Sequence, residues 1–289
     1  MINLEYKETT KKKESFYCSD YGKLDLDLYF ALKGEPKTNP PKWNDTLKWG
    51  AGKGVEMALL DLLKSNGITA QDYVQETHGR VEMIREVSIH GYIDAMTTGE
   101  KVAEFGLEAG CPIEIKSINN ANKFDISKYE SENPRENYVG QLAMYMDFLG
   151  KNRGYLFVAS IDGLHTFFFE CRRVKDRVFK CGNTQVDLDK EYKRFKDIYE
   201  TFQKDTPPAC DIRYKIPVEE IDWKSVSVTD IAKARKGQKV IGDKDSWLIG
   251  YSSWKDKIIE MQGAKVGYDE KEIEYIISNT KGYTSKRGG

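Results

Sequence analysis

The sequence predicts an α/β fold, equally describable as α+β, in which a central mixed β-sheet is flanked by helices. Two long segments, residues 46–65 and 187–204, have apolar residues at helical spacing. Segments in which apolar and polar residues alternate, as on a half-buried strand, lie between them. The order helix, strands, helix, strands and helix favours one sheet that is covered by helices.

The N-terminal part of the chain is predicted to be helical. Residues 19–33 contain the first predicted helix, which follows a cap at Ser19 or Asp20. One glycine and three prolines predict a loop from residue 33 to residue 45. The long helix at residues 46–65 follows and ends near Gly67.

Four strands are predicted in the middle of the chain, at residues 81–96, 112–118, 153–160 and 164–174. The pair Asp162-Gly163 lies between the last two and is a strong signal for a hairpin turn. A further helix is predicted at residues 138–149, between the second and third strands. Together with the helix at residues 187–204, these elements predict a main domain in residues 1–206.

The character of the sequence changes after Pro207-Pro208. Residues 209–289 contain three of the five tryptophans and alternate short strand-like and helical pieces. Residues 207–289 are therefore predicted to form a C-terminal extension or small subdomain of unknown role, with a frayed tail.

The composition is that of an ordinary globular protein and excludes several functional classes. Hydrophobic residues make up 39% of the chain and charged residues 31%, and no run of about 18 apolar residues is present that would span a membrane. The start lacks the apolar stretch of a secretory signal, which predicts a cytoplasmic protein, in a host cytoplasm if a phage encodes it. The net charge of −1 provides no general attraction to nucleic acid, so such binding must come from a local patch or from a metal.

The chemically informative residues lie on two predicted strands. In residues 87–95 (VSIHGYIDA), alternation places Asp94 on the more polar face. In residues 111–117 (CPIEIKS), Glu114 and Lys116 project side by side from one face. If the two strands pair, Asp94 meets Glu114 and Lys116.

This combination of side chains predicts a metal-assisted hydrolytic site. Two carboxylates that converge on one point repel each other unless a cation lies between them. Oxygen ligands with room for water suit Mg²⁺ or Mn²⁺. Such an ion polarises a phosphoryl oxygen and lowers the pKa of bound water, and a neighbouring lysine positions that water or stabilises developing charge. Asp94, Glu114 and Lys116 are therefore predicted to hydrolyse phosphodiesters.

A longer pattern extends these residues: Gly91-x-x-Asp94, then Glu114-x-Lys116, then Gln141-x-x-x-Tyr145. It resembles the PD-(D/E)xK nuclease superfamily, in particular its RecB/Cas4-like and phage exonuclease branch. Gly54-Val55-Glu56 fits the helix that supplies a further acidic residue in that branch, and Ser19-Asp20-Tyr21-Gly22 resembles its N-terminal helix opening. The resemblance covers residues 17–205 and implies a nuclease-like domain with a restriction-endonuclease-like core in residues 1–206.

The resemblance also implies roles for individual residues. The metal ligands would be Glu56, Asp94, Glu114 and the backbone carbonyl of Ile115. Lys116 would act on the nucleophilic water, and Gln141 would sit beside the lysine or a substrate phosphate as a further catalytic residue. Tyr145 would pack or hydrogen-bond nearby and belong to the nucleic-acid-binding residues. The implied activity is Mg²⁺- or Mn²⁺-dependent hydrolysis of single- or double-stranded DNA, more specifically by an exonuclease.

No iron–sulfur cluster is expected. Many relatives in this branch use four cysteines for one, the first near the first helix and three after the core. Here Leu24 stands near the first position, and no clustered trio follows Cys171. The five scattered cysteines are most simply free thiols of a reducing compartment.

The polar segment at residues 119–137 follows the lysine strand directly. Three basic residues in this segment are candidates for binding substrate phosphates: Lys123, Lys128 and Arg135. A solvent-exposed connection without a binding role would explain these residues equally well. Two other functions remain open: a non-catalytic nucleic-acid-binding or assembly module on the same fold, and an RNA endonuclease that uses the same residues. The intact set of two acids and a lysine argues against the first. Strand polarity, the number of metals and the oligomeric state are left open.

Overall fold

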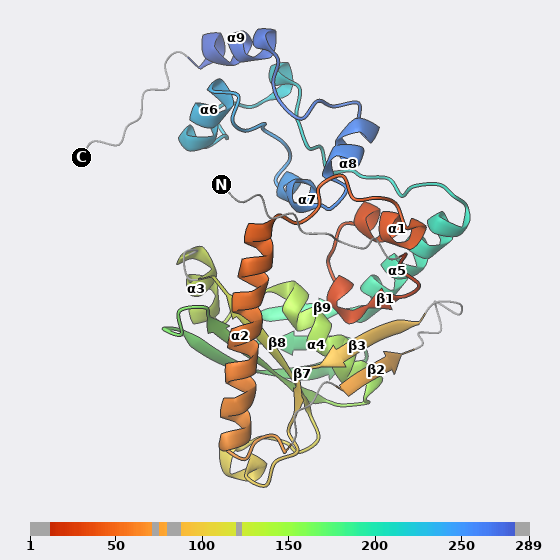
Figure 1. Cartoon of the computed structure of the whole chain (residues 1–289), viewed down its shortest axis with the longest axis vertical. Helices are drawn as coiled ribbons and strands as arrows, with labels where there is room; N and C mark the ends of the chain where they lie inside the picture. The colour runs from red at the N-terminus through yellow and green to blue at the C-terminus, as the bar shows by residue number, and fades with distance from the viewer. Residues whose placement is uncertain (1–11, 71–74, 80–87, 120–122, 281–289) are drawn as a thin grey trace, which may run out of the picture. The chain divides into compact units, whose positions relative to one another are not determined.

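The computed structural model describes residues 12–70, 75–79, 88–119 and 123–280, which belong to two compact units (Figure 1). The first unit contains the residues up to Lys23 together with Pro41–Thr206. The second contains Leu24–Pro40 together with the residues from Pro207 onward. The sequence did not predict that residues 24–40 group with the C-terminal segment.

The first unit is built on a six-stranded sheet in the order β4-β5-β6-β7-β8-β9. Its strands are β4 (Ala95–Met96), β5 (Pro112–Ile118), β6 (Arg153–Ser160), β7 (Thr166–Lys175), β8 (Val178–Cys181) and β9 (Thr184–Asp187). Strands β5 and β6 are parallel, and the other neighbouring pairs are antiparallel. This mixed sheet with flanking helices confirms the predicted fold class.

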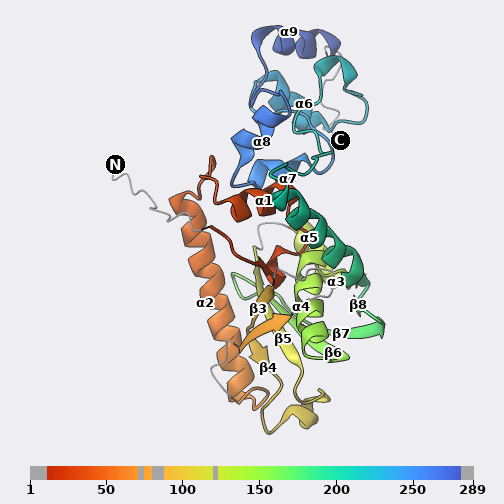
Figure 2. The same cartoon turned by 90° about the vertical axis from the view of Figure 1, so that its right-hand side faces the viewer.

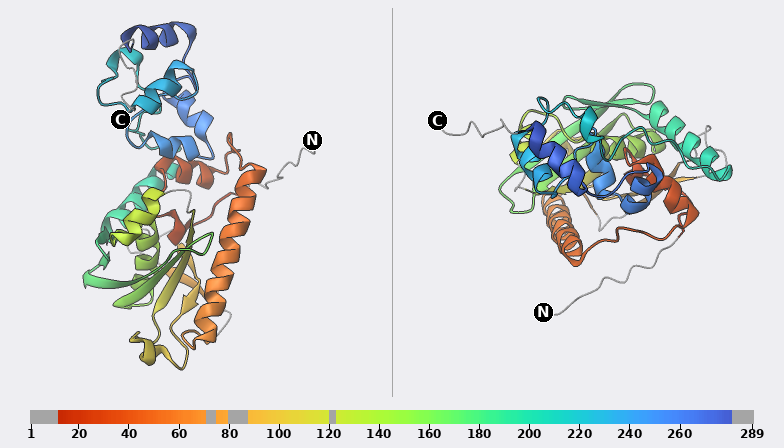
Figure 3. Two further views of the ribbon diagram at one scale, coloured as in Figure 1. Left: turned by 90° about the vertical axis from the view of Figure 1, so that its left-hand side faces the viewer. Right: turned by 90° about the horizontal axis from the view of Figure 1, so that it is seen from above.

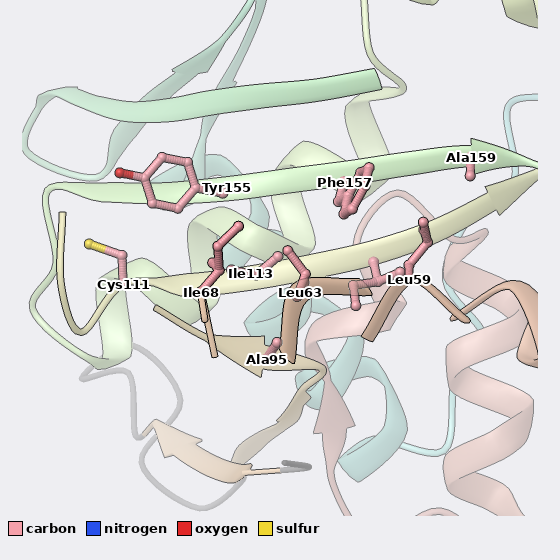
Figure 4. Packing of buried hydrophobic residues seen from close by; sticks show 10 residues of the cluster. Leu59, Leu63, Ile68, Ala95, Cys111, Ile113, Tyr155, Phe157 and Ala159 are labelled. Atoms are coloured by element: carbon pink, nitrogen blue, oxygen red, sulfur yellow. The ribbon is translucent and has the colours of Figure 1, made fainter. Parts of the chain in front are cut away.

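Helices lie on both faces of the sheet (Figures 2 and 3). On one face, Leu59 and Leu63 of α2 (Trp43–Ser65) pack into a core that includes Ile113, Tyr155 and Phe157 (Figure 4). The opposite face is covered by α4 (Glu136–Phe148), whose residues Val139 to Met146 are all buried. Gly154 of β6 lets α4 approach, because a Cβ there would lie 2.9 Å from Cγ of Met146.

A second, three-stranded sheet has the order β1-β3-β2, with β1 (Phe16–Tyr17) parallel and β2 (Gln75–Gly79) antiparallel to the central β3 (Ile89–Ile93). A 3₁₀ turn, η1 (Cys18–Asp20), follows β1, and another, η2 (Val102–Phe105), precedes β5. The remaining helices of the first unit are α3 (Lys123–Glu130) and α5 (Leu188–Gln203).

The long helices and the central hairpin confirm the sequence predictions within a few residues. Strand β6 matches residues 153–160, and the hairpin turn holds Gly163 at a φ of 71°. Helices α2, α4 and α5 correspond to the helices predicted at residues 46–65, 138–149 and 187–204. Strong local periodicity made these elements predictable.

Other predicted elements are corrected by the structure. Residues 88–96 are not one strand, because the chain bends at Asp94 and passes from β3 in one sheet to β4 in the other; residues 81–87 lie outside the described residues. The first helix begins only at Asp25, because Gly22 adopts a φ of 70° and ends the preceding turn. The polar segment at residues 119–137, for which no regular element was predicted, contains α3.

The second unit consists of helices in its described residues: α1 (Asp25–Lys33), η3 (Val218–Glu220), α6 (Val228–Arg235), α7 (Ser246–Tyr251), α8 (Lys255–Met261) and α9 (Glu270–Asn279). The prediction of short strand-like pieces after residue 209 is therefore wrong for residues 209–280. Trp254 Nε1 donates to the carbonyl of Glu35 at 3.1 Å, and Lys257 pairs with the Glu35 carboxylate at 2.7 Å. These contacts explain why residues 24–40 belong to this unit. Among the described helices of the whole chain, none combines the length and apolar character needed to cross a membrane.

Candidate active site

Strand β5 carries the two residues at the centre of the candidate site. Glu114 is completely buried, and the Lys116 ammonium forms an ion pair with Oε1 of Glu114. The Lys116 side chain keeps 21% of its surface exposed, so it lies between the buried acid and solvent. The predicted side-by-side arrangement on one strand face is present.

Asp94 joins this strand from the bend between β3 and β4. Its Oδ2 accepts a hydrogen bond from the backbone N–H of Ile115 at 2.8 Å. Strand β4 pairs with β5 only at Pro112 and Ile113. Beyond this short ladder, the Asp94 carboxylate binds the next backbone N–H of β5, that of Ile115. The structure therefore brings Asp94, Glu114 and Lys116 together at one edge of β5.

The charges of these three groups are strongly coupled. The pKa of Glu114 is raised to about 8, first by burial and then by the negative charge of Asp94, against the opposing effect of Lys116. Burial also raises the pKa of Asp94. Burial lowers the pKa of Lys116, but the charges of Glu114 and Asp94 outweigh this effect and hold the pKa above its usual value. A further cation would favour the ionised form of both acids.

The carboxylate of Glu114 lacks hydrogen bonds. Neither of its oxygens has a hydrogen-bond partner in the part of the chain that the structure describes, and its ion-pair partner is Lys116. A buried, unpaired carboxylate oxygen is costly unless a proton or a cation compensates it. Glu114 therefore fits a position that receives a cation.

Helix α2 brings Glu56 toward the same place. Gly52 packs directly on β5, since a Cβ at that position would lie 2.7 Å from Oγ of Ser117. Glu56 stands one turn farther along the helix, and its charge contributes to the raised pKa of Glu114. Its Oε2 accepts a hydrogen bond from Lys53 at 3.0 Å.

The donor set fits a hard cation in part. Asp94, which is half-buried, and Glu114, which is fully buried, supply carboxylate oxygens, the ligands that Mg²⁺ and Mn²⁺ prefer. No group of three or more His, Cys, Asp or Glu side chains is arranged to hold a metal among the described residues, so Glu56 does not complete a ready three-ligand cluster. The carbonyl of Ile115 as a ligand stays a prediction.

Gln141 and Tyr145 form a hydrogen-bonded chain behind the site. Gln141 Nε2 donates to the Tyr145 hydroxyl at 2.8 Å, and that hydroxyl donates to the carbonyl of Tyr92 at 2.9 Å. Tyr145 is 1% exposed, and its ring lies against Gly91, where a Cβ would approach Cε1 to 2.2 Å. The expected contact of Tyr145 with nucleic acid would require the ring to leave this position. In the structure its role is to hold Gln141.

A small cavity adjoins Gln141 and Tyr145. It has a volume of about 90 Å³, and its lining includes Cys18, His90 and Gly91. A space of this size with polar walls has room for several water molecules. It extends the polar surroundings of the site beyond the residues that the sequence pattern identified.

The predicted phosphate-gripping residues lie in different settings. Arg135 stacks over the ring of Tyr138 at 5.6 Å, and the Lys116 ammonium lies 5.7 Å from the same ring. Arg135 is therefore next to the candidate site. Lys128 is exposed on α3, and the side chain of Lys123 lies outside the described part of the chain.

Three further residues border the site without having been predicted from the sequence: Tyr138, Gly52 and Lys53. Tyr138 links Arg135 to Lys116, but a tyrosine at the start of a helix carries no signal for such a position. Gly52 and Lys53 lie one turn before Glu56, so helical spacing from Glu56 was the available signal.

The comparisons with known proteins identify no close relative. No family model matches the chain, and no curated protein matches it. Among solved structures, the chain is similar to an alkaline exonuclease from Laribacter hongkongensis (LHK-Exo), with 13% identity, a TM-score of 0.44, and coverage of 67% of this chain and 90% of that one. It is also similar to SSO0001, with 14% identity, a TM-score of 0.43, and coverage of 66% and 78%. Values this low carry no argument for a shared activity.

Proposed function

We propose that this chain is a Mg²⁺- or Mn²⁺-dependent nuclease that hydrolyses phosphodiester bonds in DNA. The observation that carries the proposal is Glu114, a fully buried acid with an unsatisfied oxygen, beside Asp94 and next to a partly exposed Lys116. Two acids and a lysine that reaches solvent suit the hydrolysis of an anionic ester.

Asp94 and Glu114 would hold the cation, with Glu56 and the Ile115 carbonyl as further ligands. When bound, the ion supplies Lewis acidity to a phosphoryl oxygen and lowers the pKa of water. Lys116, whose side chain is partly exposed, would stabilise the negative charge that develops on the phosphate. Gln141, fixed by Tyr145, orients a water or a phosphate oxygen from behind.

The finer proposal is that cleavage starts from DNA ends, which is what the resemblance of the motif implies. The net charge of −1 gives no long-range attraction along a duplex, so affinity must come from contacts near the site. Arg135 beside Tyr138 and exposed Lys128 are the proposed phosphate contacts.

The experiment compares labelled linear and circular DNA, single- and double-stranded, and the matching RNA, each with Mg²⁺, with Mn²⁺ and with EDTA. Lys116→Ala tests the site. Lys180→Ala, an exposed lysine on β8 of the same sheet, is the matched control. We expect metal-dependent cleavage of linear DNA that Lys116→Ala loses and Lys180→Ala keeps.

Each other result decides against part of the proposal. Cleavage of circular DNA contradicts the exonuclease, and preferential cleavage of RNA contradicts the choice of DNA. Binding of nucleic acid without any cleavage identifies a non-catalytic binding module on this fold.

A further inference from the structure

Three residues form a row along one side of α2: Trp49, Lys53 and Glu56. They stand at positions i, i+4 and i+7, which lie above one another on a helix. Glu56 and Lys53 place this side of the helix next to the candidate active site, and helical spacing places Trp49 on the same side, one turn beyond Lys53. The charge of Glu56 acts on Glu114, and the charge of Lys53 acts on Asp94.

The row is open to solvent, although it borders the face that packs on the sheet. Gly52, Leu59 and Leu63 of the same helix are buried against β5 and its neighbours. By contrast, the side chains of Lys53 and Glu56 are 64% and 26% exposed, and Trp49 is 57% exposed. An indole is thus presented beside the site without contributing to the core.

We propose that Trp49 is a stacking position for an unpaired nucleobase of the substrate, with Lys53 contacting the phosphate that follows it. This inference rests on the proposed nuclease function and adds a base subsite to it. Trp49 and Glu56 are seven positions apart, which is about 10 Å along the helix axis. At about 3.4 Å per stacked nucleotide, the base on Trp49 lies roughly three nucleotides from the phosphate at the metal-binding acids.

The chemistry of the row favours single-stranded nucleic acid. An exposed aromatic ring offers stacking to any base, and a lysine one turn away offers a charge to the backbone. The chain carries a net charge of −1, so electrostatic attraction alone is weak, and stacking supplies affinity that salt does not screen. A base that stacks on Trp49 must be unpaired, which selects strand ends and single strands over intact duplex.

The same helix provides a matched control. Trp43 lies six residues before Trp49, which turns its side chain about 120° around the helix axis, away from the site side. It is 50% exposed, close to the 57% of Trp49. Trp43→Ala and Trp49→Ala therefore each remove one exposed indole from α2. Only Trp49→Ala removes it from the row that borders the site.

The test measures binding by fluorescence anisotropy, in EDTA so that cleavage does not interfere. The probe is a fluorescein-labelled oligodeoxythymidine of about 16 nucleotides. Trp49→Ala should weaken binding by about 10-fold or more, while Trp49→Phe keeps most of the affinity and Trp43→Ala all of it. The loss in Trp49→Ala should persist at high salt, whereas the loss in Lys53→Ala should shrink. Unchanged melting temperatures establish that the variants are folded.

Equal affinity of Trp49→Ala and wild type overturns the base subsite, and so does an equal loss in Trp43→Ala. Either result leaves the nuclease proposal standing if wild type still cleaves DNA in the presence of metal. If wild type neither binds the probe nor cleaves DNA, both proposals fall. A loss that disappears at high salt also overturns stacking, because it identifies a purely electrostatic contact.

Discussion

The carboxylate of Asp94 accepts a hydrogen bond from the backbone N–H of Ile115 at 2.8 Å, across 21 positions of the chain. This one contact ties the end of β3 to the strand that carries Glu114 and Lys116. Asp94 therefore has a structural partner as well as a predicted ligand role. A substitution that separates the two roles must keep an acceptor for the Ile115 N–H while removing the charge, and asparagine does so.

The first prediction concerns catalysis by the three central residues. Asp94→Asn, Glu114→Gln and Lys116→Ala should each lower the cleavage rate by about 100-fold or more, because each removes a group that acts on the same phosphate. The double variant Asp94→Asn/Lys116→Ala should be hardly slower than either single variant, since residues that work as a unit are not additive. Single-turnover cleavage of linear DNA measures the rates. Losses that multiply in the double variant would show that Asp94 and Lys116 act independently.

The second prediction concerns metal binding and stability. Mg²⁺ at ten times its Kd should stabilise the wild-type protein by about 1.4 kcal/mol, because the ion binds the folded state only. This corresponds to a rise of about 3–5 °C in the melting temperature. Asp94→Asn should show a much smaller rise. In EDTA it should melt at the wild-type temperature or above, since it no longer buries a carboxylate whose pKa burial raises.

Thermal melting with EDTA and then with Mg²⁺ or Mn²⁺ measures both effects. Asp45→Asn is the control, because Asp45 caps the start of α2 at a distance from the site and should leave the metal response intact. Equal shifts in wild type and Asp94→Asn would place the ion elsewhere.

The site was predictable from the sequence where its geometry is local. Alternation along β5 places Glu114 and Lys116 on one face whatever surrounds the strand. The bend at Asp94 was not predictable, because it depends on the distant N–H of Ile115. Local alternation continued through Asp94 and suggested one strand where the structure has two.

Tertiary contacts also determine features of the fold that no local sequence pattern predicts. Trp254 and Lys257 bind Glu35 from more than 200 positions away, and no local pattern signals that residues 24–40 join the C-terminal segment. Strands β8 and β9 have four residues each, too short for alternation to stand out. Their turn at Gly182, with a φ of 54°, was the remaining signal.

The third prediction concerns the contact that positions Glu56. Gly52→Ala should destabilise the protein by about 1 kcal/mol and lower cleavage, because its methyl group would lie 2.7 Å from Oγ of Ser117 and force that side chain, next to Lys116, into another rotamer. Gly52→Ala/Ser117→Ala should recover both, since the nearest remaining atom is Cβ of Ser117 at 3.9 Å. Gly54→Ala has open space around it and should instead stabilise the helix by about 0.5–1 kcal/mol. Urea unfolding and cleavage assays on the four proteins measure this, and a double variant no better than Gly52→Ala would exclude the steric explanation.

The last prediction concerns pH and a buried charge cluster at the N-terminal end of the first unit. The Asp20 carboxylate is 1% exposed and pairs with Lys13 and Lys23, and it accepts a hydrogen bond from the Tyr17 N–H at 2.7 Å. Burial acts to raise the pKa of Asp20, but the two lysines and the hydrogen bonds lower it further than burial raises it. A carboxyl whose pKa is lower in the folded protein stabilises the fold above its ordinary pKa of about 3.9 and loses that contribution as the pH falls through the folded value.

Asp20→Asn keeps an acceptor for Tyr17 but leaves Lys13 buried without its charge partner. It should therefore lower the free energy of unfolding by about 3 kcal/mol at neutral pH. The difference from wild type should begin to shrink below about pH 4, where Asp20 of the unfolded chain takes up a proton, and should disappear only as the pH falls through the lower pKa of the folded protein. Urea titrations at about pH 7 and about pH 3 measure the two differences. Asp45→Asn, at an exposed helix cap, should show a much smaller difference at both values. A deficit in Asp20→Asn that stays constant with pH would mean that packing, and not the Asp20 charge, stabilises this part of the fold.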